Sequence, residues 1–167
     1  MRCPRTNKKL TPIKIHGIEI DLSEGCGGVW FDRFELEKFD EAHEGAGRIL
    51  VEHMRMHHQP LTDPDRRLNC PIDTDVVMMR RYYSGKQQIE IDECPQCGGI
   101  WLDAEELAAI RKLFPTREDY RKAQRDFVNT VMNSPEIQAY ERESGQLIEK
   151  IKSVSNVLWS IVRLGKE

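Results

Sequence analysis

Apolar and polar residues alternate along two short stretches of the chain. In the first stretch Ile18, Ile20 and Leu22 are separated by acids, and in the second Ile89 and Ile91 are separated in the same way. This period of two predicts strands with one buried face. A β-rich run precedes each stretch, and the dipeptides HG and SG between the runs are turn signals. Each stretch therefore predicts a β-hairpin.

After each hairpin the period becomes helical. Asp32 and Asp103 each stand three residues before a glutamate, a spacing typical of a capping box at the start of a helix. The pattern predicts a first helix over residues 33–55, weakened by the two glycines of its Glu-Gly-Ala-Gly segment. A second helix is predicted to end before Pro115.

Two more helices are predicted beyond Pro115. Thr116 would cap a helix over residues 117–133, and Ser134 followed by proline is a signal for a new helix. In this last helix the apolar residues alternate steps of three and four, which is an a/d heptad seam broken by Ser144. The seam consists of Ile137, Tyr140, Leu147, Ile151, Val154, Leu158 and Ile161. The pattern predicts a helical hairpin, a coiled-coil dimer, or both.

The first two hairpin-and-helix segments are copies of one repeat. Each copy opens with Cys-Pro, at Cys3 and Cys70, and each ends its hairpin with Cys-Gly-Gly, a β-branched residue, Trp, an apolar residue and Asp. These endings read GCGGVWFD in copy one and CPQCGGIWLD in copy two. The polar, proline-rich residues 57–67 between the copies predict a linker.

The pattern thus predicts an α+β protein in four parts. Copy one with its helix is expected over residues 1–56 and the linker over 57–67. Copy two with its helix is expected over residues 68–114, and the helical hairpin, a candidate assembly segment, over 115–167.

Composition limits the kinds of binding partner and the cellular compartment that we expect for this chain. The 167 residues include 28 acids and 25 bases, and the net charge of −3 weighs against bulk electrostatic binding to nucleic acid. No secretory signal stands at the start, and no apolar run approaches the roughly 20 residues that span a bilayer. The five cysteines, an odd number, suit a reducing cytoplasm, where close Cys pairs more often hold metal than form disulfides.

Copy two carries the candidate chemistry. Cys94 and Cys97 stand on a predicted tight turn, so both sulfurs point into one volume, and Cys70 with Asp73 at the matching spacing would return to them from the other end of the hairpin. Zinc accepts thiolate and carboxylate, so these four residues predict one structural Cys₃Asp zinc site per chain. A closed shell leaves no position for a substrate, and we expect a protein that is not an enzyme. Water or a histidine from elsewhere in the chain are the alternatives to Asp73 as the fourth ligand. The competing interpretation of the cysteines is a metal-free or redox-active pair.

The same positions of copy one read Cys3, Thr6, Ser23 and Cys26. Neutral hydroxyls are poor zinc ligands, so we expect no working metal site there. We expect this copy to keep the frame for packing, with hydrogen bonds through its hydroxyls in place of the metal. The bulky pairs Trp30-Phe31 and Trp101-Leu102 are expected to anchor a helix over each hairpin. A Cys3–Cys26 disulfide would require oxidation.

The segment CPQCGGIWLDAEEL resembles the signature of the transcription factor IIB-type zinc-ribbon family. The resemblance covers residues 70–113 well and residues 3–39 in degraded form, and the chain departs from the pattern at Thr6, Ser23 and Asp73. It implies two tandem zinc-ribbon-like modules and, by the family name, contact with nucleic acid or the transcription machinery.

Two further patterns bear on function. His53 and His57 are four residues apart on a predicted helix, but no glutamate stands where a zinc protease needs its base, so we interpret them as solvated residues. The segment MMRRYYSGK mixes bases and aromatics, which allows a nucleic-acid-binding ribbon that uses the residues Arg80, Arg81, Tyr82 and Tyr83. The competing interpretation is an ordinary strand with tyrosine packed inward and arginine solvated.

The apolar seam exceeds what a two-helix hairpin can cover, so we expect intermolecular burial there. The favoured prediction is a zinc-binding adaptor that binds a protein partner, or a second copy of itself, through the C-terminal helices. We expect a cytoplasmic homo-oligomer, with the nucleic-acid-binding ribbon as the alternative.

Overall fold

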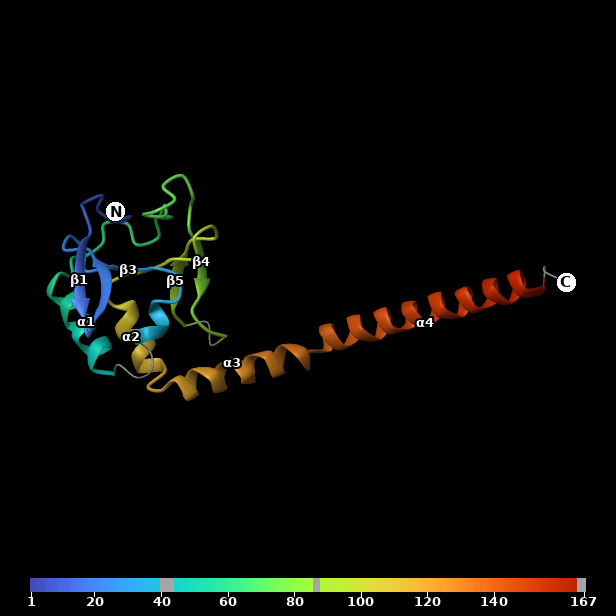
Figure 1. Ribbon diagram of the computed structural model, residues 1–167. Helices are drawn as coiled ribbons and strands as arrows, with labels where there is room; N and C mark the ends of the chain where they lie inside the picture. Colours follow the sequence, from blue (N-terminus) through green and yellow to red (C-terminus); the bar gives the residue numbers. More distant parts are fainter. Residues whose placement is uncertain (40–43, 86–87, 165–167) are drawn as a thin grey trace. The chain divides into compact units, whose positions relative to one another are not determined.

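The computed structural model describes residues 1–39, 44–85 and 88–164, apart from the side chains of residues 44, 141 and 154–164 (Figure 1). The chain forms two compact units, Met1–Gln124 and Arg125–Glu167. Both copies of the repeat lie in the first unit.

The described strands form one antiparallel sheet in the order β1-β2-β3-β6-β5-β4. Copy one supplies the first three strands and copy two the last three, so the two copies share a single sheet. The strands are β1 (Thr11–Ile15), β2 (Ile18–Leu22), β3 (Val29–Phe31), β4 (Met79–Tyr82), β5 (Glu90–Glu93) and β6 (Ile100–Leu102).

The copies meet where β3 pairs with β6. Trp30 stands directly opposite Trp101, and the flanking pairs are Val29 with Leu102 and Phe31 with Ile100. The equivalent tryptophans therefore face each other, and the first apolar position of each copy faces the third of the other, which is the arrangement expected of an approximate two-fold relation between the copies. The predicted hairpins are both present, as β1–β2 and β4–β5. The predicted boundaries of the modules, including the linker, stay predictions.

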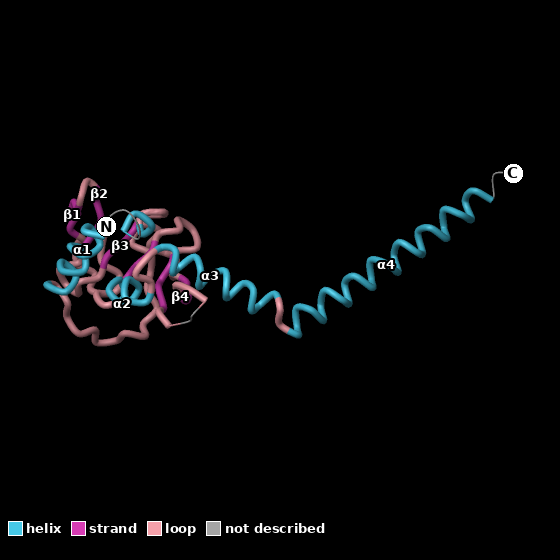
Figure 2. Tube along the Cα trace, turned by 90° about the horizontal axis from the view of Figure 1, so that it is seen from below, coloured by secondary structure: helices cyan, strands magenta, loops and turns pink. Residues whose placement is uncertain are grey.

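The described helices (Figure 2) are the 3₁₀ helix η1 (Leu36–Phe39) and the α-helices α1 (Glu44–Met56), α2 (Glu106–Leu113), α3 (Arg117–Met132) and α4 (Pro135–Leu164). Among them, η1 and α1 follow the strands of copy one and α2 follows those of copy two, as the repeat predicts. The predicted α+β class is confirmed at the level of these elements. Among the described helices, none has the length and apolar character needed to cross a membrane.

The prediction of one helix over residues 33–55 was wrong in its first part. The segment contains η1 and then α1, which begins at Glu44. Phe34 has a φ of 70°, a left-handed conformation that a right-handed helix does not accommodate, so no helix can run through this residue. The glutamate of the expected capping box does form its half of the motif, because the backbone N–H of Asp32 donates to Glu35 Oε2 at 3.0 Å.

The other predicted helix ends agree with the structure. Helix α2 ends before Pro115, and the hydroxyl of Thr116 accepts the backbone N–H of Asp119 at the start of α3, at 3.2 Å. Helix α4 begins at Pro135, where Ser134 Oγ accepts the N–H of Ile137 at 3.4 Å. Local capping chemistry fixed these boundaries.

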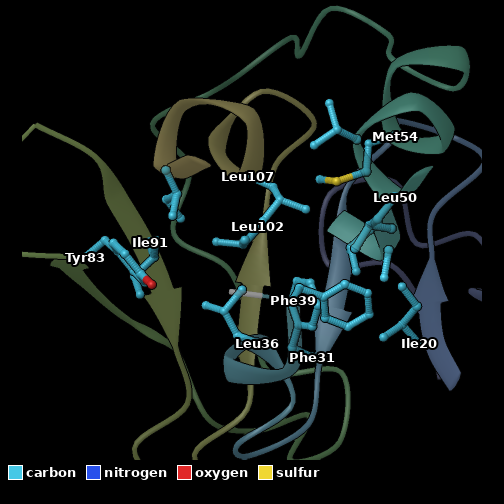
Figure 3. Close-up of a cluster of buried hydrophobic side chains, with 14 of the residues drawn as sticks. Ile20, Phe31, Leu36, Phe39, Leu50, Met54, Tyr83, Ile91, Leu102 and Leu107 are labelled. Atoms are coloured by element: carbon cyan, nitrogen blue, oxygen red, sulfur yellow. The ribbon is translucent and has the colours of Figure 1, made fainter. Parts of the chain in front are cut away.

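The sheet separates two apolar cores. Phe31 and Leu102 face the core under the helices, together with Leu50, Met54 and Leu107 (Figure 3). The second core contains both repeat tryptophans and four of the five cysteines: Trp30, Trp101, Cys3, Cys26, Cys70 and Cys94. Since successive side chains of a strand point to opposite faces, only the second residue of each Trp-apolar pair reaches the helices. The expectation that the tryptophans anchor helices was therefore wrong.

Helix α4 exposes apolar side chains at the described part of its seam. Tyr140, Leu147 and Ile151 are 68%, 59% and 60% exposed, and Ile148 beside them is 53% exposed. Ile137, the first seam residue, is partly buried, and Val154, Leu158 and Ile161 lie outside the described side chains.

Candidate metal centre

Two loops of copy two bring the four predicted donors together. Cys70 and Asp73 lie on the turn before β4, and Cys94 and Cys97 lie on the turn between β5 and β6. Their ligand atoms all lie within 4.8 Å of one another, and this is the one such group of possible ligands in the described part of the chain. The hairpin returns the first pair to the second, as the spacing predicts.

Backbone N–H groups surround the sulfurs. Those of Ile72 and Asp73 donate to Cys70 Sγ at 3.4 and 3.2 Å, and that of Cys97 approaches Cys94 Sγ at 3.5 Å. Gly98, with a φ of 73°, lets the chain turn back under the sulfurs. Such donors favour the thiolate, which is the form that binds metal.

The spacing of the donor atoms fits a tetrahedral zinc ion. A Zn–S distance of about 2.3 Å separates two sulfurs of a tetrahedron by about 3.8 Å, and a sulfur from a carboxylate oxygen by about 3.5 Å. Cys70 Sγ and Cys97 Sγ are 3.6 Å apart, and Cys94 Sγ lies 3.4 Å from Asp73 Oδ2. The distance from Cys70 Sγ to the same oxygen is 3.9 Å. These residues could hold zinc with small adjustments.

Binding of a metal must displace protons from this site. Burial raises the pKa of Cys70, and it raises the pKa of Cys97 to about 12. Without a metal these thiols stay protonated near neutral pH, so metal affinity falls as the solution becomes more acidic.

Gln96 is a site residue that the sequence pattern did not identify. Its Nε2 donates to Asp73 Oδ1 at 3.0 Å, while Oδ2 of the same carboxylate points toward the sulfurs. Gln96 thus fixes the orientation of the carboxylate. It stands between the two cysteines of the motif, and its position on that turn is the only sequence signal for this role.

Copy one keeps the same geometry with different chemistry. Cys3 Sγ and Cys26 Sγ are 3.6 Å apart as free cysteines, Cys26 Sγ lies 3.3 Å from Ser23 Oγ, and the backbone N–H of Thr6 donates to Cys3 Sγ at 3.3 Å. The hydrogen bond from Cys26 lowers the pKa of Cys3 to about 5 and raises the pKa of Cys26. The proton shared by the two cysteines and the hydroxyl of Ser23 thus connect the two turns of copy one. We call the pair of turns that carries these positions in each copy its knuckle.

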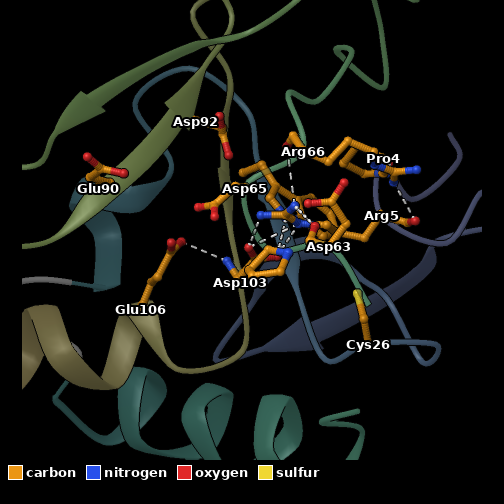
Figure 4. A network of polar contacts seen from close by, with 12 residues as sticks. Pro4, Arg5, Cys26, Asp63, Asp65, Arg66, Glu90, Asp92, Asp103 and Glu106 are labelled. Atoms are coloured by element: carbon orange, nitrogen blue, oxygen red, sulfur yellow. Dashed lines mark hydrogen bonds and ion pairs between the residues drawn. The ribbon is translucent and has the colours of Figure 1, made fainter. Parts of the chain in front are cut away.

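An ion pair joins the two copies (Figure 4). Arg5 Nε lies 3.1 Å and Arg5 Nη2 lies 2.5 Å from Asp103 Oδ2, and the arginine side chain is only 5% exposed. The Asp103 carboxylate also accepts the indole N–H of Trp101 at 2.8 Å. The capping-box interpretation was therefore right for Glu106, which accepts the N–H of Asp103 at 2.8 Å, but it missed the use of the aspartate carboxylate. The sequence alone could not predict the ion pair between Arg5 and Asp103, because it forms only when the two copies pack together.

Close contact with copy two explains why copy one shares the glycine and the tryptophan of the repeat. A Cβ at Gly99 would lie 2.0 Å from the ring of Trp30, and a Cβ at Gly28 would lie 2.2 Å from the ring of Trp101. Each copy thus leaves room for the indole of the other. Copy one thus serves as a packing partner of copy two, whatever its own ligand content.

The basic and aromatic segment of β4 is not a free basic surface. Arg80 lies 3.7 Å from an Asp92 oxygen and 3.8 Å from one of Asp65, and Arg81 pairs with Glu93. Tyr83, also named in that prediction, is 9% exposed and Tyr82 is 44% exposed. Neither His53 nor His57 belongs to a group of possible metal ligands among the described residues.

Comparison with known families supports the ribbon assignment. The family model described as transcription factor zinc-finger matches residues 2–42 and 69–112, just over half of the chain. The two matched segments coincide with the two copies of the repeat. Searches of curated proteins and of solved structures found no match.

Proposed function

The chain belongs to the transcription factor zinc-finger family, and on that premise we propose that it is an adaptor whose ribbon depends on one structural zinc ion and whose C-terminal helices bind protein. The observation that carries the first part is the convergence of three sulfurs and a carboxylate at tetrahedral spacing. Four protein donors fill the coordination shell, so the metal would cross-link two loops and have no position for a substrate.

Metal content tests the zinc half of the proposal. Elemental analysis of protein purified without chelator should find one zinc per chain, because copy one lacks two ligands. We expect Asp73→Ala to weaken zinc binding by at least about 10-fold, as loss of groups that merely orient a ligand already does. Asp75→Ala, an exposed aspartate two residues away, is the matched control. Folded protein without metal would overturn the proposal.

The helix half of the proposal rests on the exposed seam of α4. Leu147 and Ile151 are more than half exposed, and they continue the heptad spacing that begins at Ile137. A seam of this spacing is buried by a second helix with the same spacing. A second copy of the chain supplies that helix, so we propose a homo-oligomer.

The oligomeric mass in solution tests this assembly. Leu147→Asp combined with Ile151→Asp should convert the oligomer to a monomer, since two buried charges in a coiled-coil seam cannot be compensated. Gln146→Asp adds one negative charge at an exposed position outside the seam and should leave the mass unchanged. Light scattering after size-exclusion chromatography measures the mass. If the parent protein is already a monomer, self-association is excluded.

The alternative function is that of a nucleic-acid-binding ribbon, which the family description favours. If it is correct, binding to DNA or RNA should fall steeply with salt and should weaken in Arg80→Ala with Arg81→Ala. Absence of binding at low salt removes this alternative. We place the protein in the cytoplasm, because its five free cysteines suit a reducing compartment.

A further inference from the structure

A groove of about 740 Å³ lies between the metal knuckle of copy two and the knuckle of copy one. Pro4 and Pro71, which follow the first cysteine of each copy, are among its lining residues. Four cations also line it, and we call three of them the rim cations: Arg2, Lys9 and Arg66. The groove thus combines apolar surface with positive charge.

The positive charge of the rim is not compensated. None of the rim cations forms an ion pair in the described part of the chain, and no aspartate or glutamate is among the groove's described lining residues. Arg5 also lines the groove, but its charge is neutralised by Asp103. Elsewhere in the first unit, arginines such as Arg80 contact carboxylates.

Two of the rim cations are held in place by neutral groups. Arg66 Nη2 donates to the carbonyl oxygens of Pro4 and Arg5 at 2.8 and 2.6 Å, and so links the segment before copy two to the first knuckle. Arg2 Nη1 donates to the carbonyl oxygen of Asn7 at 2.9 Å. The guanidinium groups are therefore positioned before any ligand arrives, which lowers the entropic cost of binding.

We propose that this groove binds an acidic peptide segment of a partner protein. Its carboxylates would pair with the rim cations, and the stems of its side chains would pack on Pro4 and Pro71. Arginine is suited to carboxylates because its planar fork can make two parallel hydrogen bonds. The groove thus offers a second protein-binding site on the ribbon unit, distinct from the seam of α4.

The observations favour a peptide over a nucleic acid. Three uncompensated cations match the few carboxylates of a short segment, whereas a nucleic acid presents a continuous row of phosphates to a larger basic surface.

Fluorescence anisotropy of the full, zinc-loaded chain tests the proposal. The probe is a fluorescein-labelled peptide of repeated Asp-Glu-Leu triplets, compared with a peptide of Asn-Gln-Leu triplets. We expect the acidic peptide alone to bind. Arg2→Glu with Lys9→Glu should weaken binding by about 10-fold or more, equivalent to at least about 1.4 kcal/mol. Lys14→Glu, an exposed lysine of β1 away from the groove, should change it by less than about 2-fold.

Each other outcome overturns the proposal. Absence of binding, equal binding of both peptides, or equal loss in the Lys14→Glu control would each exclude a specific acidic site in the groove. Stronger binding of a single-stranded oligonucleotide, lost in the same double variant, would assign the groove to nucleic acid.

Arg2→Gln with Lys9→Gln repeats the test if charge reversal disturbs folding, which circular dichroism and zinc content report. Leu147→Asp with Ile151→Asp should still bind the peptide, so failure of the seam proposal remains separate.

Discussion

Differences between the copies at two equivalent positions determine which metal ligands each knuckle offers. Asp73 in copy two corresponds to Thr6 in copy one, and Cys94 corresponds to Ser23. That the four candidate ligands come together could be predicted, because spacing on a hairpin determines which side chains meet. Gln96 could not, since nothing in the sequence states that its amide reaches Asp73 rather than solvent.

Glu106 should make the stability of the first unit depend on pH. Burial, reinforced by the charge of Asp103, raises the pKa of Glu106 from its ordinary value of 4.5 to about 8. Asp92 also opposes its ionisation, and Arg5 favours it. Between these two pKa values the folded protein binds a proton that the unfolded chain has released, so stability falls as pH rises and the loss is complete above about pH 8.

Glu106→Gln is expected to remove this loss while keeping an oxygen that can accept the N–H of Asp103. Relative to the variant, the parent should lose about 1.4 kcal/mol of unfolding free energy per pH unit below pH 8. Urea unfolding of zinc-loaded protein between pH 6.5 and 8.5 measures the difference, and comparison at each pH cancels the contribution of the metal. Glu105→Gln, at an exposed neighbour, should leave the slope unchanged. Parallel curves for parent and Glu106→Gln would show that Glu106 is ionised throughout.

At the scale of elements, periodicity and capping were sufficient to predict the hairpins and helix starts whose conformation depends on neighbouring residues alone. The two hairpins and the starts of α3 and α4 follow from alternation, turn dipeptides and caps. The start of the first helix was missed because Phe34 adopts a left-handed φ of 70° in an otherwise helical pattern. A bulky residue has no local preference for that conformation, so the packing of the folded chain must impose it.

At the scale of the whole molecule, the sequence predicted two modules but not that they share one sheet. The pairing of β3 with β6 places Trp30 opposite Trp101, yet a tryptophan in a separate module would have the same sequence pattern. Nor does the sequence indicate a packing role for the glycine before each β-branched residue. The structure shows that Gly99 also makes room for Trp30 of the other copy.

Because the two copies share one sheet, removal of zinc should unfold both of them. Structural zinc contributes an apparent free energy of about 10–16 kcal/mol in small domains, which reaches or exceeds the total stability of about 5–15 kcal/mol of a typical protein. When the turns that carry Cys70 and Cys94 lose their cross-link, β6 loses its support, and the contact between Trp30 and Gly99 is lost with it.

Hydrogen exchange measured by mass spectrometry, before and after addition of a chelator, can follow each copy separately. The amides of β1 and β2 should lose protection in the same step as those of β4 and β5, since all four strands belong to one sheet, which we expect to open as one cooperative unit. Cys3→Ser with Cys26→Ser should respond to the chelator in the same way, because these cysteines hold no metal in our proposal. Persistent protection of β1 and β2 in metal-free protein would mean that copy one folds by itself, and the packing explanation of its retained glycine and tryptophan would fail.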